Sequence, residues 1–243
     1  MRERLSRWAQ AFSNWSLAAL LFTLPSGKHW DLYRPPLDGA HYSYYEPVLY
    51  ATELFLCAAL GSWLLSRLLD RDGTKLRWGP AFVYVPLLGF LVLGTLGLPW
   101  AAAPVYAAFP VARLVLMLVF YLMLVTAPLR RELIAWPLAA AMVIQAALSV
   151  PQFLFGHTVG LSQLGETPND SRWPGASIVA LGERRWLRAY GLSQHPNILG
   201  GLAMAYLLLV SGFSLRQSGL RRLAVLGLLS VAVGTLLLTF SRA

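Results

Sequence analysis

The chain has 243 residues, of which 57% are hydrophobic and only 13% are charged, and it carries a formal net charge of +9 at pH 7. This composition excludes an ordinary soluble domain and indicates an integral membrane protein. The positive charge does not predict nucleic-acid binding, because the basic residues flank apolar segments, which is the pattern that orients membrane proteins.

Seven apolar segments are long enough to be candidate membrane spans, since a helix needs about 20 mainly apolar residues to cross the hydrocarbon core. The first contains Gln10 and Asn14, and we interpret it as an uncleaved span because no convincing small-residue cleavage site precedes Lys28. The sequence thus predicts an all-α, polytopic membrane helix bundle of about seven transmembrane helices, in a single integral membrane domain over 1–243. The spans are expected at about 8–25, 47–69, 79–98, 111–127, 134–155, 196–214 and 222–241.

Basic residues indicate the orientation of these spans. If the N-terminus is cytoplasmic, the inner segments hold twelve basic residues, namely Arg2, Arg4, Arg7, Arg67, Arg71, Lys75, Arg77, Arg130, Arg131, Arg216, Arg221 and Arg222. The outer segments then hold eight, namely Lys28, Arg34, Arg113, Arg172, Arg184, Arg185, Arg188 and Arg242. Four of those eight lie in one long loop, 156–195, where charge influences orientation least. We therefore expect a cytoplasmic N-terminus and an outer loop before the sixth helix.

A carboxylate lies within the second predicted span, at Glu53. Carboxylates inside a membrane are costly and are usually paired, so Arg34 and Arg113 are its candidate partners. The outer segment 26–46 is rich in tryptophan and tyrosine, which is typical of the membrane interface; stacking against sugar rings is the alternative.

The run Asp70-Arg71-Asp72 has the form of the Asp-x-Asp pair that holds a metal and a nucleotide diphosphate in many sugar transferases. It lies among Arg67, Lys75 and Arg77, so we interpret it as a solvated run of charges. Since the chain also has no cluster of histidine and cysteine, we expect neither a metal site nor a cofactor.

The loop 156–195 is rich in glycine, proline, asparagine and serine before it becomes basic. A loop of this length in a compact bundle is usually functional. Residues 178–190 are compatible with a short hairpin or with an interfacial helix, and periodicity does not separate the two. Either structure is expected to place Trp186, Leu187 and Tyr190 against the bilayer.

The strongest candidate site lies where this loop meets the sixth span. Arg184, Arg185 and Arg188 precede His195-Pro196-Asn197, and proline is favoured at the first position of a helix. A helix N-terminus presents free N–H groups and partial positive charge, and guanidinium groups grip phosphate, so the pattern predicts a site for a phosphorylated, lipid-borne substrate. An ordinary interfacial arginine is the plainer explanation of Arg188.

Other residues are weaker members of the same candidate site. Arg242 shares a membrane face with Arg188 in the expected orientation, so the two cations are candidates to clamp a pyrophosphate, and Arg113 is a possible third member. Gly191 suits a close turn and Pro196 begins the helix, while Asn197 is expected mainly to satisfy local backbone groups. His195 is a candidate general base or helix cap; with no carboxylate next to it in the sequence, the catalytic residue stays unknown.

Several short motifs, in this order and spacing, resemble the O-antigen ligase and polymerase family of bacterial envelope proteins. They are Gly160-Leu-Ser-Gln-Leu-Gly-Glu166, Arg188-Ala-Tyr-Gly191, His195-Pro196-Asn197, Gly200-Gly201 and Thr239-Phe-Ser241-Arg242. The resemblance is strongest over 150–243. It implies a helical enzyme of the bacterial inner membrane that moves a glycan from an undecaprenyl-pyrophosphate carrier on the periplasmic face, without a metal, a cofactor or a nucleotide sugar.

The resemblance also implies roles and partners. Arg188 and Arg242 would hold the pyrophosphate, and the acceptor would be lipid A–core sugar of lipopolysaccharide in a ligase, a growing glycan in a polymerase, or protein in some relatives. Family members carry a catalytic histidine in a large outer loop further along, and this chain ends before such a loop. We therefore expect the chain to be the N-terminal portion of a longer protein, and we do not assign that catalytic role to His195.

Three alternatives stay open. A polysaccharide polymerase of the same family is not separable from a ligase by sequence. A transporter or flippase of lipid-linked anions would need polar residues at several mid-membrane positions, whereas the predicted spans hold little beyond Glu53 and Gln145. A non-catalytic scaffold subunit of an envelope assembly complex is the third.

Overall fold

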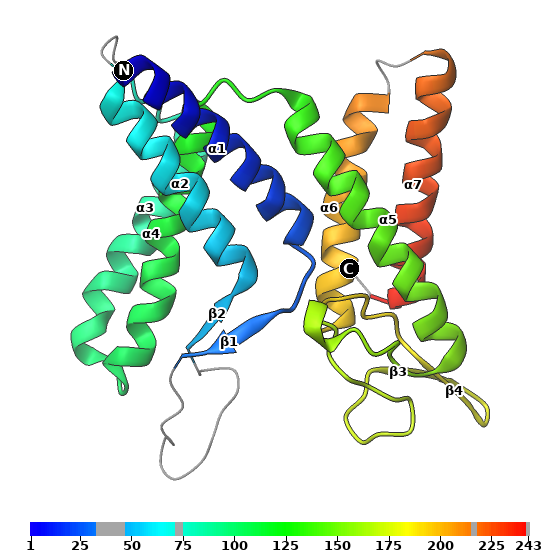
Figure 1. The fold of residues 1–243 in the computed structure, drawn as a ribbon. Coiled ribbons are helices and arrows are strands. Elements are labelled where there is room, and N and C mark those ends of the chain that lie inside the picture. The colour runs from blue at the N-terminus through cyan, green and yellow to red at the C-terminus, as the bar shows by residue number, and fades with distance from the viewer. Residues whose placement is uncertain (33–46, 71–74, 215–217, 242–243) are drawn as a thin grey trace. The chain divides into compact units, whose positions relative to one another are not determined.

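The structure, a computed structural model, describes residues 1–32, 47–70, 75–214 and 218–241 (Figure 1). Arg34, Arg242, Arg71 and Asp72, and most of the aromatic segment 26–46, lie outside these residues. The described part is mainly helical. Its helices are α1 (Arg2–Thr23), α2 (Ala51–Leu69), α3 (Ala81–Gly97), α4 (Pro104–Thr126), α5 (Arg131–Phe155), α6 (Pro196–Ser214) and α7 (Gly219–Thr239).

Short elements connect these helices. They are the strands β1 (His29–Asp31), β2 (Val48–Tyr50), β3 (Ile178–Leu181) and β4 (Arg184–Leu187), and the 3₁₀ turns η1 (Leu98–Trp100) and η2 (Ser162–Leu164). The strands form two separate pairs, β1 with β2 and β3 with β4. The predicted all-α helical character is therefore confirmed for the described residues.

Five of the described helices are long and apolar enough to cross a membrane, namely α2, α3 with η1, α4, α5 and α7. The apolar part of α6, Pro196–Gly212, is shorter, and α1 does not reach the same apolar character. These five helices indicate a multi-pass membrane protein. The expected number of seven spans and the expected cytoplasmic N-terminus stay predictions.

The fourth helix begins earlier than the sequence suggested. We expected a span at about 111–127, but α4 begins at Pro104 and contains Pro110. Pro104 occupies the first turn, where its missing N–H has no intrahelical partner to lose. Pro110 is accommodated inside the helix, as prolines frequently are in membrane helices.

The chain divides into two compact units, which are described separately. Unit 1 comprises Met1–Leu17 and Trp30–Arg130, and unit 2 comprises Ala18–His29 and Arg131–Ala243. The single membrane domain expected over 1–243 stays a prediction.

Within unit 1, small polar side chains join the first part of α1 to α2. The Ser13 hydroxyl donates to the carbonyl of Ala59 at 2.9 Å, and the Ser6 hydroxyl donates to the carbonyl of Ser66 at 3.1 Å. Serine permits close approach of two helices and hydrogen-bonds across them, which suits helices that lack a soluble protein's hydrophobic driving force.

The intramembrane carboxylate Glu53 is paired within unit 1, as expected. Arg113 Nε donates to Glu53 Oε1 at 2.5 Å, and Arg113 Nη2 lies 3.3 Å from Glu53 Oε2 and 2.6 Å from the Val48 carbonyl oxygen. The guanidinium also lies over the Tyr50 ring at 5.5 Å. Of the two candidate partners, Arg113 thus pairs with Glu53, which compensates both charges.

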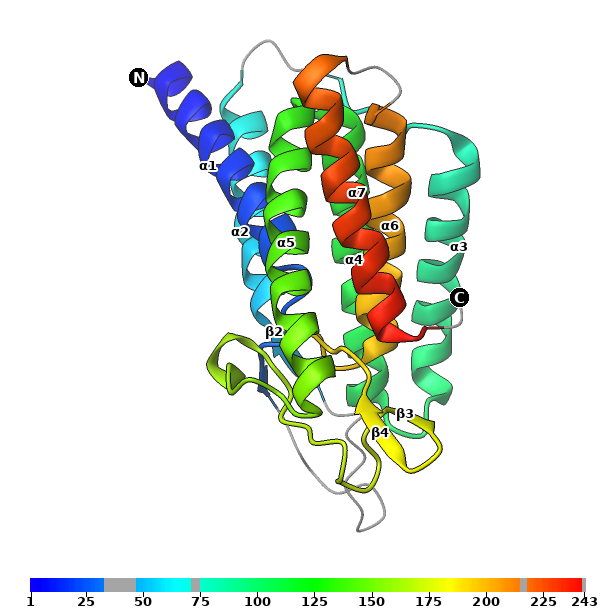
Figure 2. The ribbon, with the colours of Figure 1, turned by 90° about the vertical axis from the view of Figure 1, so that its right-hand side faces the viewer.

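Within unit 2, α5, α6 and α7 pack side by side (Figures 1 and 2). Their shared core is the cluster Ala139, Met142, Ala203, Tyr206, Val210 and Ala232. The first turn of α6 approaches the end of α7 so closely that a Cβ on Gly200 would lie 2.7 Å from Ser241 Cβ. Gly200 therefore permits this close approach, whereas a Cβ on Gly201 would meet open space.

Residues 178–190 form a hairpin, so one of the two sequence-based alternatives is correct. β3 and β4 are antiparallel: Ile178 pairs with Leu187 at one end of the ladder, and Leu181 pairs with Arg184 at the other. Gly182 takes a positive φ of 62° in the turn. Figure 2 shows the hairpin beyond the C-terminal end of α5. Our expectation that Leu187 and Tyr190 lie on the bilayer is wrong, because they are only 0% and 3% exposed and pack inward.

The core of unit 2 contains the hydroxyl of Tyr206, whose removal should not lower the stability of this unit. Tyr206 is buried, and its hydroxyl has no hydrogen-bond partner among the described residues. Tyr206→Phe should leave the melting temperature in detergent unchanged or slightly raised, since it removes an unsatisfied buried polar group and keeps the ring. Tyr206→Ala should cost about 3 kcal/mol or more through the cavity it leaves. A clear destabilisation by Tyr206→Phe would show that the hydroxyl has a partner.

Candidate functional site

Arg188 connects the beginning of α6 to the end of α7 within unit 2. Its Nε donates to the Thr239 carbonyl oxygen at 2.6 Å, and its Nη2 donates to Asn197 Oδ1 at 2.6 Å. Its backbone N–H donates to the Ser177 carbonyl at 3.0 Å, which extends the β3–β4 ladder by one residue. A cation at the C-terminal end of α7 is also favoured by the helix dipole. The side chain is therefore held in one position.

The charge of Arg188 is not compensated by any described carboxylate. Its hydrogen-bond acceptors are a carbonyl and an amide oxygen, both of them neutral. No described residue accepts from its Nη1, so this end of the guanidinium has N–H groups to offer a ligand. Guanidinium suits phosphate oxygens because its N–H groups lie in a planar fork.

His195 caps α6. Its Nδ1 accepts from the Asn197 N–H at 3.2 Å, and its carbonyl accepts from the Ile198 and Leu199 N–H groups at 3.0 and 3.3 Å. Because Nδ1 is an acceptor, the neutral ring carries its proton on Nε2, which lies 3.3 Å from the Ser177 hydroxyl. Of the two roles considered for His195, this geometry supports the cap.

This cap corrects one part of the sequence-based argument. We expected free backbone N–H groups at the start of α6, but Pro196 has none, and those of Asn197 and Ile198 are bonded to His195. An anion at this end would therefore contact Arg188 directly, while the main chain of α6 contributes only its dipole.

The segment that carries Arg188 is buried and is held by two glutamines of α5. Gln152 Oε1 accepts from the N–H groups of Tyr190 and Gly191 at 3.1 and 2.7 Å, and its Nε2 donates to the Gly191 carbonyl at 2.9 Å. Gln145 Oε1 accepts from the Leu192 N–H at 2.8 Å. Both glutamines are nearly inaccessible, at 0% and 2% exposed. The main chain after β4 is thereby satisfied although water does not reach it.

Gly191 has a specific steric reason to be glycine. Its φ is 57°, and a Cβ built on it would lie 1.9 Å from Gln145 Oε1. Both the left-handed backbone and the close approach of the amide exclude a larger residue. The close turn expected at Gly191 is present.

A buried carboxylate, Glu166, extends the network into the loop. Its Oε1 accepts from Gln152 Nε2 at 2.7 Å and from the Val159 N–H at 2.8 Å, and its Oε2 accepts from the Leu161 N–H. These bonds compensate the cost of a carboxylate that is only 3% exposed. Loop 156–195 is therefore an ordered element anchored to α5.

Residues that follow α1 close the network from another side of unit 2. The Gly27 N–H donates to the Leu192 carbonyl at 2.7 Å, and the Ser193 hydroxyl donates to the Pro25 carbonyl at 3.1 Å. The Ser26 hydroxyl donates to the Leu164 carbonyl at 2.6 Å. The main chain on both sides of Gly191 is thus fixed by segments far apart in the sequence.

Aromatic rings flank the position of Arg188. Phe153 is stacked between Trp186 and Phe240, with ring centroids 6.2 and 5.9 Å apart and interplanar angles of 10° and 16°. Trp186 precedes Arg188 by two residues, and Phe240 follows the carbonyl that Arg188 binds. The stack therefore joins the end of β4, next to Arg188 in the sequence, to the residue that follows the Thr239 carbonyl.

The structure brings together some of the predicted site residues and not others. Arg188, His195, Pro196 and Asn197 form one cluster, with Gly191 beneath it. Arg184 and Arg185 are exposed near the turn of the hairpin, and no bond joins them to that cluster. Arg113 belongs to unit 1 and is paired with Glu53, so a role in holding pyrophosphate has no support from its contacts. Arg242 lies outside the described residues.

Sequence reasoning missed Gln152 entirely and noticed Gln145 only as a polar residue in a span. The signal was available, since the two lie seven residues apart and so share one face of a helix. Two amides on one face of an apolar helix indicate a buried main-chain segment that needs partners.

No family model matches the chain, and no curated protein or solved structure matches it. Family membership is therefore a proposal that depends on the residues themselves.

Gln152 should be essential for the stability of unit 2. Gln152→Leu would leave the N–H groups of Tyr190 and Gly191, the Gly191 carbonyl and one bond of Glu166 unsatisfied in a buried place, at about 1–3 kcal/mol for each such group. We expect a large fall in the detergent melting temperature. The matched control is Gln163→Leu, since Gln163 is exposed in η2 and should tolerate the change. Equal melting temperatures for the two variants would contradict the assignment.

The cap by His195 predicts a pH dependence. Partial burial and, secondarily, the charge of Arg188 lower the pKa of His195 below its usual value near 6.5. As the pH falls, His195 therefore takes up its proton in the unfolded chain at a higher pH than in the folded chain. The contribution of the neutral His195 cap to stability is complete above the usual pKa of histidine and is lost on acidification. The melting temperature should decrease from about pH 7 to about pH 5. His195→Asn should show a smaller decrease, whereas His157→Gln should retain it; the same slope in His195→Asn would refute the cap.

Proposed function

We propose that the cluster around Arg188 binds the pyrophosphate of a lipid-linked glycan. The observation that carries this proposal is a guanidinium fixed through Nε and Nη2 by neutral oxygens, with no described carboxylate on it. A structural arginine in a membrane protein is usually compensated, as Arg113 is by Glu53. A guanidinium that is fixed at the N-terminal end of α6, with no described carboxylate as its partner, is suited to bind an anion.

The neighbouring groups favour an anion that is attached to a lipid. The N-terminal end of α6 adds the positive end of its dipole to the charge of Arg188. The stacked rings of Phe153, Trp186 and Phe240 offer apolar surface around the end of β4, next to Arg188 in the sequence. A pyrophosphate joined to an isoprenoid chain combines the two chemistries, and undecaprenyl pyrophosphate is the carrier that the family resemblance implies.

The proposed reaction is transfer of the glycan to an acceptor hydroxyl. The acceptor oxygen forms a bond to the anomeric carbon, the bond between that carbon and the pyrophosphate oxygen breaks, and the carrier leaves with the electron pair as its pyrophosphate. Arg188 stabilises the charge that develops on this leaving group. The acceptor proton passes to a base that we do not assign; His195 Nδ1 already accepts from Asn197, so it is not that base.

Other proposed ligands depend on the same resemblance. Arg242 follows Ser241, which lies against Gly200 at the start of α6, so its position in the sequence suits a second pyrophosphate ligand. Arg184 and Arg185 would contact the donor from the hairpin. The proposed setting is the periplasmic face of a bacterial inner membrane with the N-terminus in the cytoplasm, and the proposed activity is that of an O-antigen ligase or of a polymerase in the same family.

Substitution of Arg188 tests this proposal. In nanodiscs, Arg188→Gln should weaken binding of undecaprenyl pyrophosphate about tenfold or more, because a charge-assisted hydrogen bond contributes about 1.5–3 kcal/mol. Transfer of the lipid-linked glycan by the full-length protein in membranes should also be lost. Arg172→Gln is the matched control, because Arg172 lies in the same loop but is already paired with Asp170 at 2.6 Å.

The Asn197→Ala variant distinguishes ligand binding by Arg188 from a purely structural role of this residue. This variant removes one bond that holds Arg188 and keeps the cation. If Arg188 acts as a pyrophosphate ligand, the Asn197→Ala variant should bind undecaprenyl pyrophosphate far more tightly than the Arg188→Gln variant does. This difference should hold even if the two variants have the same melting temperature. Equal binding by the two variants, or unchanged binding by Arg188→Gln, would overturn the proposal.

A further inference from the structure

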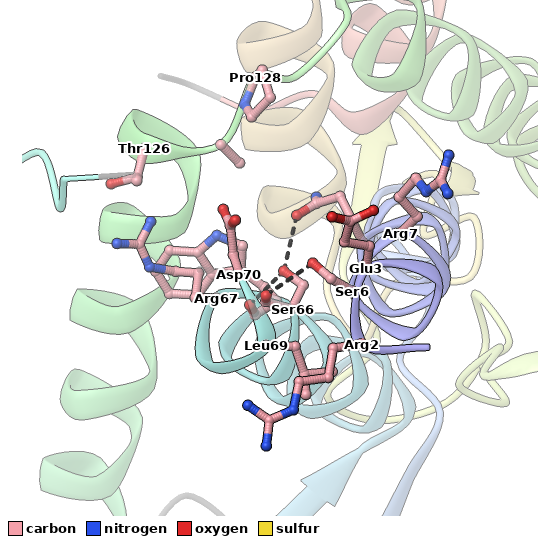
Figure 3. A pocket seen from close by; sticks show the side chains of 13 residues that line it. Arg2, Glu3, Ser6, Arg7, Ser66, Arg67, Leu69, Asp70, Thr126 and Pro128 are labelled. Atoms are coloured by element: carbon pink, nitrogen blue, oxygen red, sulfur yellow. Dashed lines mark hydrogen bonds between the residues drawn. The ribbon is translucent and has the colours of Figure 1, made fainter. Parts of the chain in front are cut away.

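Each unit contains a cavity among its described residues, and the two cavities differ in their lining. The cavity of unit 1 has a volume of about 670 Å³ and is lined by cationic, carboxylate and hydroxyl side chains from α1 and α2 (Figure 3). A lining of both charges does not select one class of ligand. The cavity of unit 2 has a volume of about 140 Å³, and its lining side chains are apolar except for those of Gln145 and Tyr206. Its few polar groups define the chemistry of an occupant more narrowly.

The walls of this smaller cavity come from three segments of unit 2. They belong to α5, to the first four turns of α6 and to the residues around the end of α1, and they include Leu21, Leu24, Leu138, Met142, Leu199 and Leu209. Leu24 and Leu209 are 41% and 51% exposed, so the cavity is open at one edge rather than enclosed. Since α5 is long and apolar enough to cross a membrane, the hydrocarbon chains of lipids are the available apolar occupants.

Gln145 contributes an amide with unused hydrogen-bond donors to the lining. Its Oε1 accepts from the Leu192 N–H at 2.8 Å, which identifies the other terminal atom as the nitrogen. No described residue accepts from Nε2, so its two N–H groups are left to a ligand. The side chain is only 2% exposed, and a buried donor without a partner is costly. The amide therefore points to an occupant that carries a hydrogen-bond acceptor.

A water molecule fits this cavity poorly. A buried water makes two to four hydrogen bonds to polar partners, and apolar cavities of about 150 Å³ stay dry. The Tyr206 hydroxyl is itself buried away from the cavity, so among the described lining side chains Gln145 alone could hold a water. A volume of about 150 Å³ admits about six carbon atoms, as in benzene. An apolar ligand with one acceptor oxygen therefore suits the cavity better.

Gln145 also marks a boundary between polar and apolar surroundings along α5. Towards the C-terminal end of this helix, Gln152 bonds to the main chain of the loop. In the opposite direction, the α5 residues that line the cavity are apolar as far as Leu138. The α6 wall runs from Leu199, at the same end as Gln145, to Leu209. At about 1.5 Å per residue, the apolar walls extend about 10–15 Å from the amide.

We propose that this cavity binds one acyl chain of a membrane glycerolipid, with the ester carbonyl of that chain accepting from Gln145 Nε2. In such a lipid the ester lies where the polar headgroup meets the hydrocarbon chain, which matches the boundary at Gln145. The chain then extends between α5 and α6 towards Leu209. The hydrogen bond satisfies the buried amide, and the hydrocarbon fills the apolar space. This site is independent of the cluster around Arg188.

Ester-linked and ether-linked lipids test the role of the amide. Protein in nanodiscs is given equal amounts of a diester and a diether phosphatidylcholine with chains of the same length, and the lipid that stays bound after release is measured by native mass spectrometry. The two lipids differ only at the carbonyl carbons, so the diester should be retained about fivefold in preference, as one net hydrogen bond predicts. Equal retention would indicate filling by hydrocarbon alone or a water on Gln145, and it would overturn the proposal.

A bulky substitution at the edge of the cavity locates this preference. Ala205 lines the cavity from α6 and is exposed, so Ala205→Phe should put a ring into the space of the acyl chain. The preference for the diester should then disappear. Ala147→Phe is the matched control and should retain the preference, because Ala147 is exposed on α5 and does not line the cavity. The same retention ratio in the two variants would refute the cavity as the site.

A substitution of Gln145 tests the donor itself. Gln145→Met keeps an unbranched side chain of similar length but has no amide, so the folded variant should lose the preference for the diester. A preference retained by this variant would contradict the assignment of Nε2 as the donor. Because Gln145→Met also loses the bond to the Leu192 N–H, the ether lipid and Ala205→Phe test the site without disturbing that bond.

Two controls separate this site from the cluster around Arg188. Undecaprenol, an isoprenoid alcohol without a carbonyl, should not displace the diester lipid at equal concentration; displacement would identify an isoprenoid chain as the occupant and would overturn the proposal. Arg188→Gln should keep the preference for the diester, and Ala205→Phe should keep the binding of undecaprenyl pyrophosphate, so the two proposals can fail separately. Loss of the preference in Arg188→Gln would place the lipid at the Arg188 cluster and would exclude the cavity.

Discussion

The hydrogen bonds between α5 and the main chain at residues 190–192 are the constraint on which unit 2 depends. This segment is buried next to helices, so its N–H and C=O groups cannot bond to water. Gln145 and Gln152 satisfy it from one helix face, and Glu166 completes the bonding of Gln152. Because these hydrogen-bond partners lie on one helix, the position of the main chain at 190–192 is fixed relative to α5.

The fixed position of this main chain is the basis for interpreting Arg188 as a candidate functional residue. The backbone before Gly191 is fixed, and the guanidinium is then held between the end of α7 and the start of α6. Because His195 already satisfies the first N–H groups of α6, the site offers an anion a side-chain cation rather than a backbone cradle. Such a cation can be placed against a leaving group without reorganisation, which is the form of electrostatic stabilisation that favours catalysis.

The sequence predicted the helical character and most helix positions, because spans of apolar residues leave few alternatives. It also predicted the closeness of Arg188 to the start of α6, since Pro196 marks a helix beginning and Arg188 is eight residues away. The inward packing of Leu187 and Tyr190 was not predictable, because hydropathy does not distinguish a residue facing lipid from one facing a protein core. For His195, the sequence left a general base and a helix cap as alternatives, and the ring orientation in the structure favours the cap.

Arginines in this chain show that charge alone does not identify a site. Arg113 and Arg172 each lie against a carboxylate, and their charges are compensated locally. Arg2 and Arg7 line a cavity together with the carboxylate of Glu3. Arg188 has only neutral acceptors among the described residues. The degree of local compensation therefore distinguishes Arg188 from Arg113 and Arg172, which counting basic residues along the sequence cannot do.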